Sequence, residues 1–93
     1  MNKYETVFLV KNDITEEERN AVVDKIEKYL KENGNIIKSE ALGLKKLAYE
    51  IRKYKEAYYY LLEFESAPET IIELERIYRI TDEVLKFIVV RKD

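Results

Sequence analysis

The order of the apolar patterns along the chain constrains its fold more than any other feature. Residues 3–10 are rich in aromatic and β-branched side chains, which is typical of a strand. Apolar residues then recur at helical spacing from Val22 to Leu30, followed by extended stretches at residues 35–51 and 57–64. A second helical stripe covers residues 68–79, and residues 84–90 form a last apolar strand. The pattern therefore predicts the order βαββαβ.

This order restricts the topology to few arrangements. Two crossovers with one helix each favour right-handed connections, which place both helices on one face of a sheet. The sequence therefore predicts an α+β fold, the ferredoxin-like βαββαβ sandwich. It should have a four-stranded antiparallel sheet, with the first and third strands central and two helices on one face. The length of 93 residues suits a single domain spanning residues 1–93.

Local signals predict where the helices and turns begin and end. Thr15 and Glu18 form a capping box, which predicts a first helix over residues 16–33. Gly34 is expected to end this helix in the left-handed conformation of a C-cap. Gly43 interrupts the second strand and predicts a bulge, residues 52–56 are expected to form a hairpin tip, and Pro68 should be the first residue of the second helix.

Composition excludes several classes of protein. With no His and no Cys, the chain has neither the bases of His-dependent catalytic pairs nor a disulfide framework. The acidic run at residues 16–18 is explained by helix capping, so we predict no enzyme, no metal and no cofactor. No leader-like segment opens the sequence and no apolar run is long enough to cross a bilayer, which favours a cytoplasmic location.

Strand alternation divides the apolar residues between two faces of the sheet. One set is expected to form the core with the helices: Phe8, Val10, Leu62, Phe64, Phe87 and Val89 against Val22, Ile26, Leu30, Ile71, Leu74 and Tyr78. The helix-free face still carries a second apolar set, and an exposed patch of this kind usually marks a partner surface. We therefore predict a partner-binding face made of Val7, Leu9, Tyr59, Leu61, Ile88 and Val90. A sheet that is merely rich in β-formers and shielded by Tyr is the alternative.

Basic residues form two groups once this topology is imposed. Five belong to the hairpin of the second and third strands: Lys45, Lys46, Arg52, Lys53 and Lys55. The others follow the edge made by the first and last strands, and these are our candidate RNA-binding residues: Lys3, Tyr4, Arg79, Lys86, Arg91 and Lys92. The net charge of −2 is unusual for a protein that binds nucleic acid, so any RNA contact must come from such local clusters.

Four segments carry a resemblance to a known family. Residues 43–51 (GLKKLAYEI) resemble the second-strand signature of the bacterial small-subunit ribosomal protein six family. The opening Tyr4-Glu5, residues 55–59 (KEAYY) and residues 78–86 (YRITDEVLK) are similar to the corresponding parts of that family. The resemblance covers essentially the whole chain. Ala57 departs from it, because many relatives have Gly there.

The resemblance implies a structural constituent of the small ribosomal subunit, located on the ribosome. Such a protein binds the central domain of small-subunit ribosomal RNA together with small-subunit ribosomal protein eighteen, a smaller basic protein. A basic partner would account for the charge of −2 and would cover the apolar face. The residues alone leave an alternative open, a ferredoxin-like regulatory module for ligand binding or dimerisation.

Overall fold

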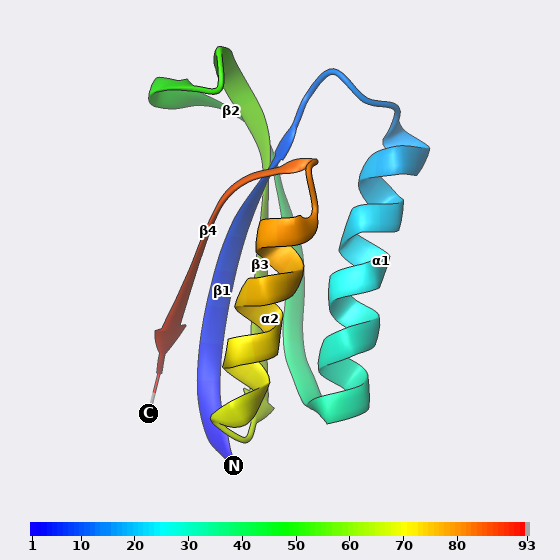
Figure 1. Ribbon diagram of the computed structural model, residues 1–93, viewed down its shortest axis with the longest axis vertical. Helices are drawn as coiled ribbons and strands as arrows, with labels where there is room; N and C mark the ends of the chain where they lie inside the picture. The colour runs from blue at the N-terminus through cyan, green and yellow to red at the C-terminus, as the bar shows by residue number, and fades with distance from the viewer. Residues whose placement is uncertain (93) are drawn as a thin grey trace.

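The computed structural model describes residues 1–92 and has the predicted element order. The chain forms four strands and two helices, and Figure 1 shows how they are arranged in space. Their bounds are β1 Asn2–Lys11, α1 Glu16–Asn33, β2 Gly34–Ile51, β3 Tyr54–Ser66, α2 Glu69–Ile80 and β4 Val84–Arg91. The strands extend slightly beyond the predicted limits, and α2 begins one residue later than expected because Pro68 occupies its N-cap position.

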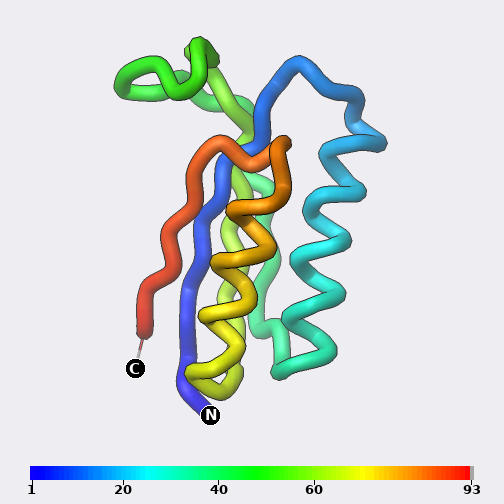
Figure 2. The backbone as a smooth tube through the Cα atoms, viewed as in Figure 1, coloured from blue at the N-terminus to red at the C-terminus, as the bar shows by residue number. Residues whose placement is uncertain are grey.

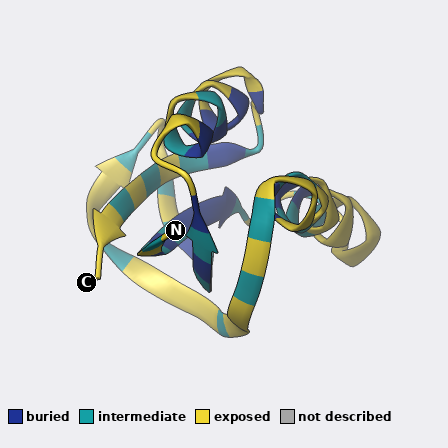
Figure 3. Cartoon of the chain, turned by 90° about the horizontal axis from the view of Figure 1, so that it is seen from below, coloured by how far each residue is buried: buried dark blue, intermediate teal, exposed yellow. Residues whose placement is uncertain are grey.

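The four strands form one antiparallel sheet in the order β2-β3-β1-β4, so β1 and β3 are central as predicted. Both helices cover the same face of this sheet (Figures 1 and 3), which confirms the ferredoxin-like arrangement. Figure 2 shows that the two chain ends lie at one end of the molecule and the β2–β3 hairpin at the other.

The start of α1 follows from the predicted capping box. The backbone N–H of Glu18 donates to Thr15 Oγ1 at 3.1 Å, and the backbone N–H of Thr15 donates to Glu18 Oε1 at 2.9 Å. Hydrogen bonds from the backbone and then the side chain of Thr15 favour the ionised carboxylate and hold the pKa of Glu18 below its ordinary value. The cap is therefore complete at neutral pH and weakens as the pH falls through that lowered pKa.

The two glycines have different roles, and the prediction of a left-handed cap at Gly34 was wrong. Gly34 is extended, with φ 175° and ψ −141°, so it is no left-handed cap. A Cβ at this position would collide with the carbonyl oxygen of Glu65 on the neighbouring strand, so close strand approach requires the glycine. Gly43 has φ +89° and lies at a shift in register between β2 and β3, which confirms the predicted bulge.

The hairpin turns over only two residues. Arg52 and Lys53 have φ values of 51° and 70°, and β3 begins at Tyr54, so the predicted tip at residues 52–56 was too long. Positive φ at both central residues is the geometry that matches the twist of a two-residue hairpin. Neither residue is Gly or Asn, so composition gave no signal for so tight a turn.

The core lies between the sheet and the helices, as the strand alternation predicted. Its fully buried members include Phe8, Val10, Ile26, Leu30, Leu62, Phe64, Leu74 and Tyr78. Phe87 and Val89 pack against this cluster but remain partly exposed, because β4 is an edge strand. Tyr78 stacks on Phe87 with ring centroids 4.8 Å apart.

One polar contact crosses the core. The Thr6 hydroxyl donates to the carbonyl of Ile88 at 2.8 Å, so its single proton is used. Tyr78 Oη lies 2.9 Å from Thr6 Oγ1 and must therefore donate to it. Burial raises the pKa of the Tyr78 phenol, which keeps this donor protonated. These two hydrogen bonds connect α2 to β1 and β1 to β4.

We expect Thr6→Val to cost about 1–3 kcal/mol of unfolding free energy, because it leaves the buried Tyr78 hydroxyl without an acceptor. Tyr78→Phe in the same chain removes that hydroxyl, so the double variant should lose clearly less than the sum of the two single losses. Urea unfolding of the four chains measures the cycle. Additive losses would show that the two hydroxyls do not depend on each other.

Candidate functional site

The face of the sheet opposite the helices has an apolar centre. Val7 of β1 lies between Leu61 of β3 and Ile88 of β4 in the strand register. Ile88 and Val90 are 49% and 45% exposed. A shallow hollow of about 200 Å³ opens beside them, lined by Val7, Leu9, Tyr59, Lys86, Phe87 and Ile88. The structure thus brings the predicted partner-binding residues together on one face.

Leu9 is the exception, because the protein covers this residue itself. It is only 6% exposed although it lies on the face without helices. The end of the β2–β3 hairpin, residues 47–53, bends over this part of the sheet toward β4 (Figure 1); we call this segment the hairpin tip. A hollow of about 110 Å³ lies between tip and sheet, lined by Leu9, Leu47, Ala48, Tyr49, Ile51, Tyr59 and Lys86. The prediction of Leu9 as an open partner contact was therefore wrong, since its side chain packs under the hairpin.

Sequence reasoning also missed the tip residues as members of this surface. Leu47 and Ile51 are half-buried, whereas Tyr49 is 71% exposed at the rim. Leu47 and Ile51 were expected to lie at the end of the second strand, and their apolar character was the signal that this segment packs against other residues. Because the register between β2 and β3 breaks after Lys46, strand alternation could not place them.

Acidic residues border the apolar centre. Glu5 of β1 pairs in register with Glu63 of β3, and Glu40 of β2 lies opposite Leu61. Lys92 lies 3.5 Å from Glu5, and Lys38 lies 3.2 Å from Glu40, so part of this charge is balanced. The open face is thus apolar in the middle with carboxylates at its margin.

The predicted basic edge is divided between the two faces of the sheet. Lys86 pairs in register with Leu9 and therefore lies on the open face. Lys92 also lies there, because its backbone N–H donates to the Lys3 carbonyl at 2.8 Å and its side chain reaches Glu5. Lys3 is exposed beside it.

The two arginines of that edge lie on the helix side instead. The Arg79 guanidinium sits 6.0 Å from the ring centre of Phe87 and 3.6 Å from Glu75. Arg91 donates to the side-chain oxygen of Asn2 at 3.0 Å. The strand register was therefore predicted correctly, but the basic residues form two groups on either side of β4.

Tyr4 requires a correction. Its ring is buried, with 7% exposed, and it stacks on Phe64 with centroids 5.6 Å apart. An RNA base has no free face of this ring to stack on, so Tyr4 belongs to the core. Its hydroxyl accepts a hydrogen bond from Asn2 at 3.2 Å.

Clusters of metal-ligating residues and membrane-spanning helices are two other features that would point to a function. Within residues 1–92, no three Asp or Glu side chains gather in a way that could hold a metal ion. None of the helices in this part of the chain is long and apolar enough to cross a membrane. The two faces of the sheet edge present exposed apolar area and charged side chains.

Comparison with known proteins identifies the family. The family model of ribosomal protein S6 matches residues 3–91. The chain belongs to the ribosomal protein S6 family. This agrees with the resemblance carried by residues 43–51 and with the observed βαββαβ topology.

The similar proteins cover the full length of the chain. It is 46% identical over 97 aligned positions to the small ribosomal subunit protein bS6 of Helicobacter acinonychis, covering all of this chain and 66% of that relative. It is 42% identical to the bS6 protein of Caldanaerobacter subterraneus, covering all of this chain and 99% of the other. The crystal structure of 30S ribosomal protein S6 from Thermotoga maritima superposes with a TM-score of 0.93 at 34% identity, over 98% of this chain and 87% of that one.

We expect Leu9→Ala to cost about 2–3 kcal/mol of unfolding free energy, because Leu9 packs beneath the hairpin tip. Ile88→Ala, on the same face but half exposed, should cost less than about 1 kcal/mol. Thermal or urea unfolding of the free chain distinguishes them. Equal losses would mean that the tip does not cover Leu9 in solution.

Proposed function

We propose that this S6-family chain is a structural constituent of the small ribosomal subunit. In this proposal it binds the central domain of small-subunit ribosomal RNA together with small-subunit ribosomal protein eighteen. Family membership supports the ribosomal assignment. The observation that carries the partnership is the apolar centre of the open face, which has a half-exposed Ile88 and Val90 and carboxylates at its margin.

The chemistry of the open face favours a basic protein as its occupant. Apolar area supplies the affinity when it is removed from water, and complementary charge fixes orientation and partner choice. Glu5, Glu40 and Glu63 would face cations of the partner. The partner would therefore cover Val7, Tyr59, Leu61, Ile88 and Val90, with Leu9 acting as support beneath the tip.

The edge strand β4 offers the RNA contacts. Lys3, Lys86 and Lys92 approach it from the open face, and Arg79 and Arg91 from the helix side. Phosphate contacts dominate RNA affinity, and five cations on a chain of net charge −2 supply few of them. We therefore infer that the basic partner completes the RNA-binding surface.

A ligand-binding regulatory module is the weaker alternative. The two hollows beside the open-face residues hold about 200 and 110 Å³, whereas small-molecule sites usually enclose roughly 300–1,000 Å³. They suit side chains of a partner protein better than a cofactor-sized ligand.

The chain alone should bind central-domain RNA weakly, and the partner should raise its affinity at least tenfold. Gel-shift titrations with and without small-subunit ribosomal protein eighteen measure this. Within the complex, Arg79→Ala and Lys86→Ala should each weaken RNA binding. Each should also reduce the slope of log affinity against log salt concentration by about one, the amount expected for one lost phosphate contact. Tight, specific binding by the isolated chain would contradict the proposal.

Ile88→Glu should act on the partner first, because it places a charge in the middle of the apolar face. We expect partner association to fall at least about a hundredfold while the fold is retained, since Ile88 is half exposed. Calorimetric titration with the partner measures the loss, and Ile72→Glu on the exposed side of α2 serves as the matched control. Equal effects of the two changes would rule out this face as the partner surface.

A further inference from the structure

The position of the hairpin tip is not fixed by strand pairing. The ladder between β2 and β3 continues, with two smaller shifts in register, up to Lys46 opposite Glu56 and resumes only at Ile51 opposite Tyr54. The residues between them therefore lack partners in the register that could hold them over the sheet. Yet Leu47 and Ile51 reach the hollow above Leu9, so other contacts must keep the tip bent.

Two side chains at the turn attach the tip to the body of the protein. Arg52 donates to the backbone carbonyl of Asp82 at 3.0 Å and to its carboxylate at 3.3 Å. Tyr54 donates its hydroxyl proton to Asp13 at 2.8 Å, and this bond raises the pKa of the phenol. Asp13 precedes α1, and Asp82 lies in the loop between α2 and β4, so both anchors belong to parts of the chain far from β2.

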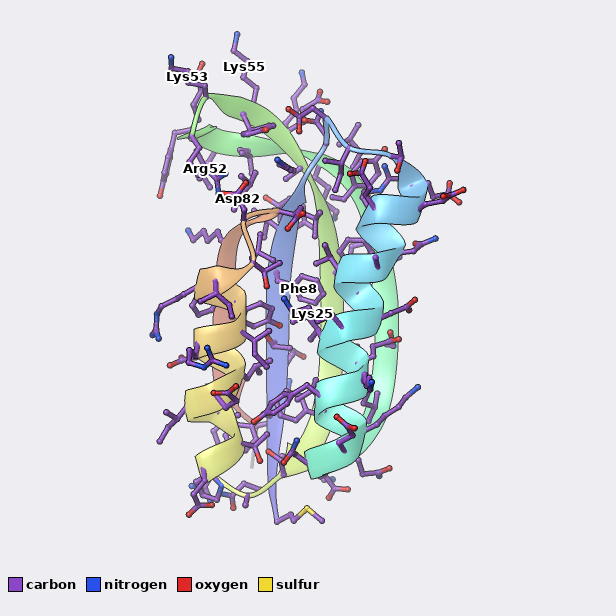
Figure 4. All side chains as sticks on the ribbon, turned by 45° about the vertical axis from the view of Figure 1, so that its right-hand side comes forward. Phe8, Lys25, Arg52, Lys53, Lys55 and Asp82 are labelled. Carbon is purple, nitrogen blue, oxygen red and sulfur yellow. The ribbon has the colours of Figure 1, made fainter. Side chains whose placement is uncertain are left out.

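Asp82 is the central member of this attachment. Besides Arg52, its carboxylate lies 3.7 Å from Lys11 at the end of β1. Figure 4 shows Arg52 near Asp82, while Lys53 and Lys55 extend away from the body of the molecule. The Arg52 side chain therefore points toward the body of the protein, whereas the neighbouring Lys53 and Lys55 side chains point away from it (Figure 4).

We propose that Asp82 is a positioning residue that, through Arg52, holds the hairpin tip over the open face and so preforms one wall of the partner-binding surface. This inference rests on the proposed function. A tip that swings freely would expose Leu9 and leave the wall made by Leu47 and Ile51 undefined. The partner would then bind only the fraction of molecules in which the tip is closed, and its apparent affinity would fall in proportion to that fraction.

Because the chain contains no Cys, a single introduced thiol can be labelled selectively and can report whether the tip is closed. In a Leu9→Cys background, the rate of thiol labelling reports opening of the tip. In an Ile26→Cys background, where the residue is fully buried on the inner side of α1, it reports opening of the core. We expect Asp82→Lys to speed labelling at position 9 about tenfold and to leave position 26 unchanged. An exposed pair alone changes such an equilibrium only several-fold, and the reversed charge also repels Arg52 and Lys11.

Three further variants separate a positioning role from damage to the fold. Arg52→Glu combined with Asp82→Lys restores opposite charges and should return labelling to within about twofold of the parent. Glu73→Lys reverses another surface pair, with Arg76 on α2, and adds the same charge, so it should change neither rate. The milder Asp82→Asn should move labelling at position 9 in the same direction by about threefold.

The binding experiment with the partner uses chains without the introduced thiols. Titration with small-subunit ribosomal protein eighteen should show about fivefold weaker binding for Asp82→Lys, recovery in the Arg52→Glu/Asp82→Lys chain, and parent affinity for Glu73→Lys. Unchanged labelling at position 9, or faster labelling with unchanged partner affinity, would overturn the positioning role. Failure of the parent chain to bind the partner would overturn the proposed function instead, and the labelling would still decide whether Asp82 holds the tip.

Discussion

The structure depends on β1 being covered on both of its faces. Phe8 and Val10 are fully buried beneath the helices, and Leu9 between them is buried beneath the protein's own hairpin. A shift of this strand by one residue would move its buried core side chains to the open face and Leu9 to the core. Thr6 adds a polar constraint, because its hydroxyl has fixed partners on α2 and β4. The positions of β3 and β4 follow from this strand.

The same arrangement limits the surface available to a partner. The hairpin tip occupies the part of the open face around Leu9, whereas the apolar part around Val7, Ile88 and Val90 remains accessible. This exposed part lies next to the tip, so a docking protein would contact sheet and tip together. Partner binding would then depend on the geometry of the hairpin. Its turn is formed by Arg52 and Lys53, which both have positive φ.

The features that the sequence predicted are those determined by local periodicity. The element order, the capping box at Thr15, the bulge at Gly43 and the pairing of β1 with β4 all follow from spacing and alternation. The features that it missed depend on contacts between distant segments. Gly34 is required by the approach of the Glu65 carbonyl, and Leu9 is covered by a segment about forty residues further along the chain. Tyr4 was predicted to contact RNA because it lies beside Arg91, although strand alternation places it on the face of Phe8, where it stacks on Phe64.

The division of the basic residues bears on how RNA and a partner could bind at once. Lys86 and Lys92 lie on the open face and Arg79 on the helix side, with β4 between them. An RNA strand lying flat on either face would meet only part of this charge, whereas a phosphate backbone that follows the exposed edge of β4 could reach both groups. Such a path leaves the centre of the open face free, so the partner and the RNA need not compete for the same surface. The division therefore favours a joint complex in which RNA runs along the edge and the partner covers the face.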